Sequence, residues 1–444
     1  MHLPNAAISL LSRCANGPLA IFAGRGVYAA AQFATLAAVA RCCGAEAVGD
    51  VVLGLAVAVP SFVLFGGQLR IVQATDPNGR FAFGAVERWG LLGHSLGFLL
   101  VAAIAFLFRS DSPGLITLLG VGLARAAESW SEIAYGALQR QRSFAAISLS
   151  TAVKSVASCA IGLPVLILFR SPGLAFAASG IVWLAGSVLF DRPLAMRRLA
   201  AAASGETSPG HAASTELLKT ALPLSAGATV SAFDTQAPRY FVEAYLGSRA
   251  LGLFGVTHYA ALSILTLIIP LTYVWTPALA KDVARGDGVA FRRRSRRALL
   301  YATALAAATA LFAIPAGPVL ASLFAEPSLA QGWTLTLTVA AAGALAPAAM
   351  LESMLRAAHG FRLLCTLQIA SLIVHAGACT AGLGWFGLEG VAGAMLLRSV
   401  VYLTMLAVGS YVVTKAAFRG RVTEAGTDAS DERSPDVTRA RAAA

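Results

Sequence analysis

The sequence predicts an all-α integral membrane protein of about 12 transmembrane helices, arranged as two six-helix lobes related by a parallel repeat. The first observation is composition: 57% of the 444 residues are hydrophobic and 13% are charged, whereas about a quarter of a soluble protein is charged. The second is that apolar runs of about 20 residues, each sufficient to cross a ~30 Å hydrocarbon core, recur along almost the whole chain. The third is an internal repeat of sequence motifs.

Taken in order, the apolar runs divide the chain into two lobes and three polar segments. Residues 1–17 form a cytoplasmic lead-in, because they are too weakly cationic for a signal peptide and their apolar stretch is too short. The N-terminal lobe is expected at residues 18–192, a cytoplasmic linker at 193–217, the C-terminal lobe at 218–415, and a disordered cytoplasmic tail at 416–444. The spans are predicted at residues 18–40, 47–69, 86–108, 114–138, 144–169, 173–191, 218–243, 250–276, 297–324, 330–354, 362–386 and 389–413.

Lysine and arginine gather in alternate loops, and this asymmetry predicts the orientation of the chain. One set of loops carries most of them, including the cluster from Lys281 to Arg297, and the other set carries only Arg41, Arg109, Arg170 and Arg249. Because cytoplasmic loops are the basic ones, both termini are predicted to be cytoplasmic. The run Arg292–Arg297 is therefore interpreted as a topogenic cluster that contacts anionic lipid, and nucleic acid is not expected as a partner.

The two halves of the chain share two short patterns in the same order. A Glu-Ser pair followed by glycine occurs in the fourth and the tenth predicted spans, at Glu128, Ser129 and Gly136 and again at Glu352, Ser353 and Gly360. Similar glycine-containing segments end the first and seventh spans, around Gly44 and Gly247. Six spans followed by six more in the same orientation indicate a parallel repeat about an axis along the membrane normal, which is a common transporter design.

No catalytic or metal-binding pattern is present in the sequence. It has no phosphate-binding glycine loop, no HExxH motif and no nucleophile, base and acid set in an exposed region. The histidines lack metal-ligand spacing, and those within spans, His94, His258 and His375, are interpreted as packed or hydrogen-bonded helix residues, with a proton relay as the alternative. We therefore expect neither an enzyme nor a cofactor or metal.

Five basic side chains lie inside the predicted spans, at Arg25, Arg125, Lys154, Arg239 and Arg398. A charge at mid-bilayer costs roughly 2.5–3.5 kcal/mol even on the lenient insertion scale, so such residues usually face a bundle interior or a wet cavity. A guanidinium group offers two parallel donors that match a phosphate. A membrane bundle with a cationic interior therefore favours the transport of an anionic solute or lipid headgroup.

Neighbouring residues refine the expected role of each cation. Arg25 is flanked by two glycines, which allow close approach, and Gln32 lies on nearly the same helix face. In the seventh span Asp234 and Arg239 bracket a proline that loosens the helix. Arg125 is spaced to pair with Glu128, either as a structural salt bridge or as part of the site.

Lys154 and Arg398 have no acidic neighbour at helical spacing, so they are either neutralised from other helices or available to a ligand. We expect Arg25, Arg239 and Lys154 to contact the anionic headgroup first, with Arg398, Arg125 and Gln32 as further binding residues. The acidic residues expected to couple ions or balance charge are Glu128, Asp234 and Glu352.

Three segments carry a family resemblance: Gly67–Asp76 after the second span, Tyr135–Gln139 closing the fourth, and Ala237–Val242 in the seventh. They resemble the polysaccharide transporter family, within the superfamily that also contains multidrug/toxin extruders and lipid II flippases. The resemblance covers roughly residues 15–415. Its motifs are loose, and their combination with twelve spans and a parallel repeat is more specific than any one of them.

The resemblance implies a V-shaped pair of lobes around a cavity that opens alternately to each side of a bacterial inner (cytoplasmic) membrane. It implies secondary transport of an undecaprenyl-pyrophosphate-linked glycan from the cytoplasmic to the periplasmic leaflet, for surface polysaccharide, exopolysaccharide or O-antigen synthesis. Membrane lipids, a polysaccharide polymerase and chain-length proteins would be its partners. If Gly44 and Gly247 are aligned, Arg25 and Arg239 lie about three helical turns apart in depth, so they would contact different parts of the ligand.

Two other functions compete with this prediction. An organic-cation extruder of the same superfamily would need acidic and aromatic lining, whereas the predicted interior is net basic. An integral-membrane glycan polymerase or glycosyltransferase would be expected to display a larger outer loop than the short ones predicted here. Both remain alternatives, and the identity of the glycan and of the coupling ion is open.

Overall fold

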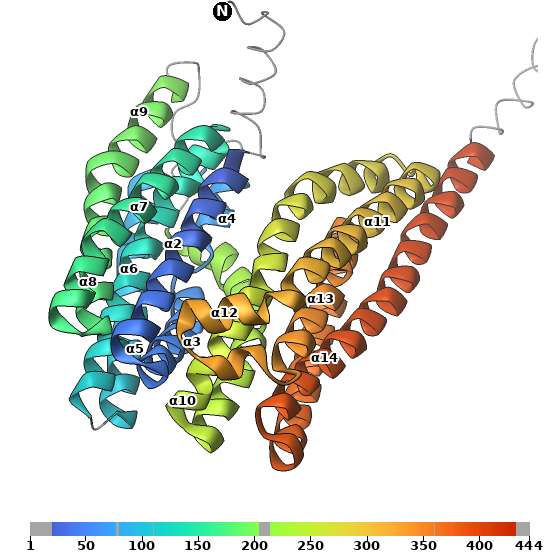
Figure 1. The fold of residues 1–444 in the computed structure, drawn as a ribbon. Helices are drawn as coiled ribbons and strands as arrows, with labels where there is room; N and C mark the ends of the chain where they lie inside the picture. Colours follow the sequence, from blue (N-terminus) through green and yellow to red (C-terminus); the bar gives the residue numbers. More distant parts are fainter. Residues whose placement is uncertain (1–19, 77–79, 110, 204–213, 359, 432–444) are drawn as a thin grey trace, which may run out of the picture.

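The computed structural model describes residues 20–76, 80–109, 111–203, 214–358 and 360–431, and these residues form helices joined by short turns. The N-terminal lobe contains α2 (Ala20–Cys43), α3 (Ala45–Phe65), α4 (Leu69–Ala74), α5 (Phe83–Phe108), α6 (Ser112–Arg140), α7 (Phe144–Phe169), α8 (Pro172–Gly186), a π-helical turn (Ser187–Asp191) and α9 (Arg192–Ala203). The C-terminal lobe contains α10 (Ser214–Ala284), α11 (Gly288–Ala313), a 3₁₀ turn (Ile314–Ala316), α12 (Gly317–Phe324), a second 3₁₀ turn (Pro327–Ala330), α13 (Thr334–Ala357) and α14 (Phe361–Asp431). Figure 1 shows the lobes side by side, with α3 and α10 at their junction.

The predicted fold class is confirmed. Two very long helices are each interrupted by one glycine with non-helical backbone angles, α10 at Gly247 and α14 at Gly387. Counting each as two segments, and the continuous α8–α9 as one, the described residues form twelve helical segments of membrane-spanning length. By length and composition alone, seven of the described helices are long and apolar enough to span a membrane. Helix α6 is long enough but is not one of these seven, because Arg125, Glu128 and Glu132 lower its hydropathy.

Several predicted boundaries differ from those in the structure. The sixth span continues from α8 through the π turn into α9, so the predicted linker 193–217 is partly helical, and residues 204–213 lie outside the described residues. The ninth span begins at Gly288, so the run Arg292–Arg297 lies on a helix, where its long aliphatic stems cover apolar surface. The tail predicted to be disordered is helical as far as Asp431, and no proline interrupts the chain between Phe361 and Pro435. Residues 1–17 and 432–444 lie outside the described residues.

The internal repeat is visible in the backbone. Gly44 joins the first two spans with φ 86° and ψ 174°, and Gly247 joins the seventh and eighth with φ 81° and ψ 174°. These angles lie in a region that only glycine enters readily. The two glycines therefore make equivalent turns in the two lobes, as their sequence contexts predicted.

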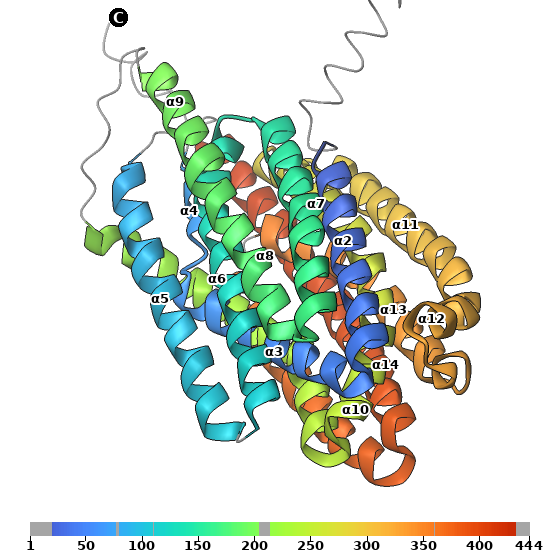
Figure 2. The ribbon, with the colours of Figure 1, turned by 60° about the vertical axis from the view of Figure 1, so that its left-hand side comes forward.

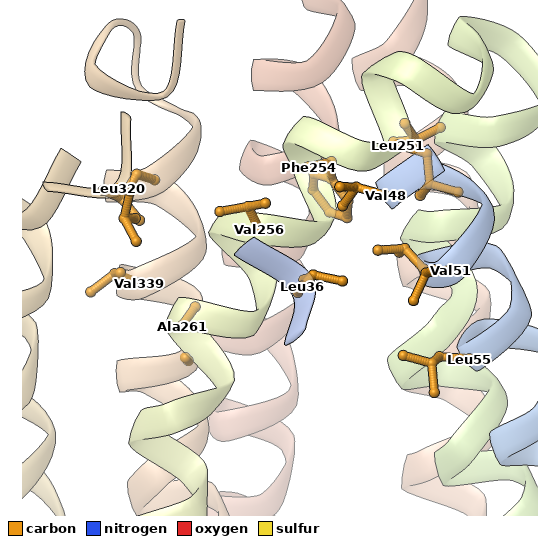
Figure 3. Close-up of a cluster of buried hydrophobic side chains, with 14 of the residues drawn as sticks. Leu36, Val48, Val51, Leu55, Leu251, Phe254, Val256, Ala261, Leu320 and Val339 are labelled. Carbon is orange, nitrogen blue, oxygen red and sulfur yellow. The ribbon is translucent and has the colours of Figure 1, made fainter. Parts of the chain in front are cut away.

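The lobes are in close contact next to these two turns. A Cβ atom added at Gly49 would lie 1.8 Å from the carbonyl oxygen of Ser248, and one added at Gly252 would lie 2.0 Å from that of Ala45. In lipid, where apolar side chains gain little from leaving the solvent, small residues that admit close backbone packing hold helices together. Around this contact, buried side chains from both lobes interdigitate, including Val48, Val51, Leu251 and Phe254 (Figure 3).

Polar contacts join the lobes at the same end. Arg109 at the end of α5 forms ion pairs with Asp50 of α3 at 2.8 Å and with Glu243 of α10 at 2.7 Å. Arg41 of α2 donates hydrogen bonds to the carbonyl oxygens of Ser322 and Leu323, both at 2.7 Å. The loop charges predict that this end is the periplasmic one. Helix α9 and the start of α7 lie at the opposite end of the bundle (Figures 1 and 2).

Candidate functional site: a cationic cavity between the lobes

A cavity of about 300 Å³ lies between the two lobes. Helices α2, α3, α6 and α8 line it from one side and α10 from the other, and its polar lining consists of Arg25, Tyr28, Gln32, Arg125, Gln236, Arg239 and Tyr259. A second cavity of about 350 Å³ shares Arg25, Val59 and Arg125 with it and extends to the loop after α3 and the end of α6. The structure thus brings together four of the six predicted binding residues, namely Arg25, Gln32, Arg125 and Arg239.

Arg239 is the most buried of the cations in this cavity, with 1% of its surface exposed. Its Nη1 donates to Gln236 Oε1 at 2.6 Å and to the Tyr259 hydroxyl at 3.4 Å, and the guanidinium stacks 4.7 Å from the centre of the Tyr259 ring. Its Nε and Nη2 atoms have no hydrogen-bond partner, and within the described residues it forms no ion pair. Nε and Nη2 form the side-on edge of the guanidinium, which is the edge that binds a carboxylate or phosphate with two parallel bonds.

Arg125 and Glu128 pair on one face of α6, as their spacing predicted. Arg125 Nη1 also donates to the Tyr28 hydroxyl at 2.9 Å, and that hydroxyl lies 3.0 Å from Glu128 Oε2. Gln32 Nε2 lies 3.5 Å from Glu128 Oε1. Because Glu128 has three contacts of this kind, its carboxylate stays compensated if one of them is given up to a ligand.

Arg25 lies nearer the second cavity and pairs with Glu132 at 3.2 Å. Glu132 also pairs with Arg70, which donates in addition to Gln139 Oε1 at 3.1 Å. One carboxylate is therefore shared by two guanidinium groups. Among the described residues, the two linings contain four arginines, Arg25, Arg70, Arg125 and Arg239, and the carboxylates that pair with three of them are Glu128 and Glu132, so the arginines outnumber these carboxylates by two.

Lys154 is placed differently from the prediction that it contacts the ligand. Its Nζ pairs with Asp191 at 2.5 Å and donates to the Ser131 hydroxyl at 2.9 Å, and the residue lines neither cavity. The rings of Tyr135 and Trp183 lie 4.9 and 4.4 Å from it. This ammonium group is enclosed inside the N-terminal lobe with its charge already compensated, and it does not lie at the cavity where the prediction placed it.

Arg398 is also neutralised from another helix. It pairs with Asp234 of α10, whose other carboxylate oxygen lies 2.9 Å from His375 Nδ1. The Arg398 guanidinium lies 4.9 Å from the centre of the Tyr402 ring. The group lies inside the C-terminal lobe and outside both cavity linings, so Arg398 does not join Arg25, Arg125 and Arg239, and Asp234 balances charge there.

Glu352 of α13 occupies the position in the repeat that corresponds to Glu128. It pairs with Arg356 one helical turn further on, and the Tyr402 hydroxyl donates to it at 2.7 Å. Like Asp234, it balances charge within the C-terminal lobe and does not line either cavity. No contact in the described part of the chain tests whether Glu128, Asp234 or Glu352 couples an ion.

The sequence reasoning missed five residues of the site, one of which is Tyr259, whose ring stacks on Arg239. Glu132 follows Glu128 by one helical turn and so shares its face of α6, a signal that a survey of acidic as well as basic residues would have found. Arg70 lies in the segment Gly67–Asp76, which the sequence analysis places after the second span, and so it was not among the basic residues predicted inside spans. Tyr28 and Gln236 gave no signal, because an uncharged polar residue in a span is common and only the packing of helices brings these two to the cavity.

The arrangement of helices resembles that of known transporter structures. No protein-family model matches the chain, and no curated protein matches it in sequence. A point mutant of the Vibrio cholerae MATE transporter VcmN superposes with a TM-score of 0.64 at 14% identity over 90% of this chain and 95% of its own. A MATE complexed with MaL6 gives a TM-score of 0.66 at 14% identity over 91% and 96%. The chain has the fold of a MATE transporter.

A third similar structure concerns the charge of the pocket. It is a MOP superfamily transporter from Pyrococcus furiosus in which the reverse polarity of the binding pocket suggests a different function. It superposes on this chain with a TM-score of 0.64 at 15% identity over 90% of this chain and 95% of its own. These likenesses establish the fold alone and leave the cargo to be argued from the cavity.

Proposed function

We propose that the chain is a secondary transporter that moves a phosphorylated anion by alternating access. Its proposed cargo is an undecaprenyl-pyrophosphate-linked oligosaccharide, carried from the cytoplasmic to the periplasmic leaflet of a bacterial inner membrane for surface polysaccharide or exopolysaccharide synthesis. The observation that carries this proposal is Arg239, a buried guanidinium that lines the cavity between the lobes and whose Nε and Nη2 atoms have no hydrogen-bond partner among the described residues.

The charge of the cavity supports an anion over a cation. A buried charge without a partner destabilises the folded protein by several kcal/mol, about 3–5 where a partner is removed. Such a charge is therefore expected mainly at functional sites. The excess of two arginines over Glu128 and Glu132 matches a pyrophosphate diester, which carries two negative charges. The two connected cavities, of about 300 and 350 Å³, together provide space of the size that small-molecule sites use.

The position of the cavity supports a route from one side of the membrane. The second cavity reaches Gln68, Arg70 and Gln139, which lie at the end that the loop charges predict to be cytoplasmic. At the other end the glycine contacts and the Arg109 ion pairs hold the lobes together. A headgroup would therefore enter from the cytoplasmic side and meet Arg70 and Arg25 before Arg125 and Arg239.

The test replaces Arg239 by methionine, which keeps an unbranched apolar stem of the side chain and removes the charged end. Surface polysaccharide is measured in a cell that depends on this protein, with protein level and thermal stability measured in parallel. We expect export to fall by about 10- to 100-fold, since each hydrogen bond to a charged group contributes about 1.5–3 kcal/mol. Thermal stability should stay the same or rise, because an uncompensated buried charge is lost.

Two further variants make the result specific. Arg239→Lys keeps the charge but loses the bidentate edge, and we expect it to restore export only in part. Lys219→Met removes an exposed cation from the same helix and should leave export unchanged. Normal export by Arg239→Met at normal protein level would refute the assigned role.

An organic-cation extruder is the second candidate, because aromatic side chains line the same cavity. Tyr28, Phe33, Phe176 and Tyr259 provide the aromatic faces that bind drug cations, and MATE transporters share the fold. Three arginines in the same lining oppose a cation. Efflux of ethidium from cells expressing the wild-type chain, lost in Glu128→Gln, would favour this candidate over the anion transporter.

A further inference from the structure

A separate cavity of about 790 Å³ lies on the C-terminal lobe between α11, α13 and α14. It shares no lining residue with either central cavity. Its floor is apolar and includes Leu299, Leu351 and Met354, and exposed Leu300 and Tyr411 stand beside it. On a lobe of membrane-spanning helices, a groove with this apolar lining is expected to face lipid.

The groove has a polar end and an apolar end. Along α11 its lining runs from Phe291 to Thr303, which is about 18 Å of helix and so more than half of the ~30 Å hydrocarbon core. Its cations, Arg292, Arg296 and Lys415, all lie at the end that is predicted to be cytoplasmic. Charge at the membrane surface and apolar lining beneath it follow the order of headgroup and acyl chain in a phospholipid.

The cations at the polar end are not neutralised by the described residues. Arg292, Arg296 and Lys415 form no ion pair there, although the neighbouring Arg294 pairs with Asp282 at 2.7 Å. Lys415 Nζ contacts only the uncharged Tyr411, whose hydroxyl lies 3.5 Å away and whose ring centre lies 5.3 Å away, so its charge is uncompensated among the described residues. The three positive charges therefore complement an anion.

A fourth polar group at this end is buried and has no partner. Ser295 is 4% exposed, lines the groove, and its hydroxyl makes no hydrogen bond within the described residues. It shares one face of α11 with Arg292, Arg296 and Leu299, since residues three and four apart lie above one another on a helix. The hydroxyl is thus placed to donate to the same anion that the two guanidinium groups bind.

We propose that this groove binds one anionic glycerophospholipid of the cytoplasmic leaflet. Its phosphate lies against Arg292, Arg296 and Lys415 and accepts a hydrogen bond from Ser295, and one acyl chain follows Leu299, Leu300 and Ala407. The polyprenyl chain of a cargo is disfavoured, because the groove is built from the C-terminal lobe alone while the cargo headgroup must reach the cavity between the lobes. The bound lipid fills the space between α11 and α14 and stabilises that lobe.

The test measures binding of dioleoyl phosphatidylglycerol to the purified full chain in a nonionic detergent by native mass spectrometry. The groove variant is Arg292→Gln/Arg296→Gln/Lys415→Gln. Its control is Arg285→Gln/Arg293→Gln/Arg297→Gln, which removes the same charge from exposed positions outside the groove lining. Since each basic residue near a lipid surface contributes about 1 kcal/mol, the groove variant should bind about a hundredfold more weakly and the control less than about fivefold.

A second variant tests the apolar part. Ala407→Trp fills the path of the acyl chain without changing any charge, and we expect it to weaken binding of phosphatidylglycerol about tenfold or more. Phosphatidylcholine should bind wild type about tenfold more weakly than phosphatidylglycerol. Equal losses in the groove and control variants would overturn the proposal, because they indicate diffuse attraction. Tighter binding of undecaprenyl pyrophosphate at this groove, or a dimer that protects it, would also overturn it.

Discussion

The enclosed pair of Lys154 and Asp191 offers a direct test of whether a buried cation serves the fold or the cargo. In Lys154→Met the carboxylate of Asp191, 0% exposed, keeps its hydrogen bond from Ser150 at 2.5 Å but loses its counter-charge. Removing one member of a buried pair costs about 3–5 kcal/mol. For a folding unit of the size of this lobe, each kcal/mol shifts the melting temperature by about 2–4 °C, so we expect a drop of about 6–20 °C.

The double variant Lys154→Met/Asp191→Asn should recover most of this loss. It leaves no uncompensated charge, and the asparagine can still accept the hydrogen bond from Ser150, so replacing both charges is expected to be close to neutral. Unfolding is followed by tryptophan fluorescence, to which Trp183, whose ring centre lies 4.4 Å from Lys154 Nζ, contributes together with the other five tryptophans. Export of surface polysaccharide is measured for the same proteins.

Two results would refute this reasoning. If the double variant melts as low as the single one, the pair is not the source of the lost stability. If the double variant is stable but does not export, Lys154 acts on the cargo after all, as its place in the sequence first predicted. A stable and active double variant supports the structural role.

Two further changes probe the junction and the cavity. Gly49→Ala adds one methyl group 1.8 Å from the Ser248 carbonyl oxygen, and we expect it to lower the free energy of unfolding by about 1–3 kcal/mol and to reduce export. The control Gly343→Ala, with no atom within 4 Å of the new carbon, should change neither melting temperature nor export. If Gly49→Ala has no effect, the lobes need not touch at this position. Glu132→Gln removes the carboxylate that pairs with Arg25 and Arg70. We expect about tenfold tighter binding in a titration with undecaprenyl pyrophosphate, and slower export in cells. Weaker binding would contradict an anionic cargo.

The sequence predicts the parts of this fold that depend on one segment at a time. Spans follow from runs of apolar residues, and the repeat follows from paired motifs, whose glycines Gly44 and Gly247 have nearly the same backbone angles. The boundaries of helices are less well predicted where a helix continues beyond the apolar run into charged residues. The cluster before Arg297 lies within α11, and the π turn at Ser187–Asp191 continues α8 into α9.

Partners of the buried charges could not be predicted from helical spacing. Arg125 and Glu128 lie on one helix, and their pairing was predicted. Arg398 and Asp234 are 164 residues apart, and Lys154 and Asp191 are 37 apart. Only the packing of different helices decides such pairs, so a cation that has no acid on its own helix can be either neutralised or free.

Arg239 has an acidic residue on its own helix and yet does not pair with it. It shares α10 with Asp234, yet Asp234 binds Arg398 and His375 and leaves Arg239 with uncharged neighbours. The acidic groups Asp234 and Glu352 of the C-terminal lobe are thus used within that lobe. In the N-terminal lobe, Glu132 lines the second cavity, and Glu128 contacts Gln32 and Arg125 of the first cavity lining.

This asymmetry indicates which side chains can respond to an anion. Glu132 binds two guanidinium groups, so Arg25 can turn to a phosphate while Arg70 keeps the carboxylate compensated. Arg239 needs no exchange, because its Nε and Nη2 atoms are already free of partners among the described residues. An anion that bridges Arg25 and Arg239 would contact α2 and α10 together. The negative charge of the ligand would then connect the two lobes. The binding energy would then favour the arrangement in which both arginines face one ligand, which is the differential affinity that a transport cycle requires.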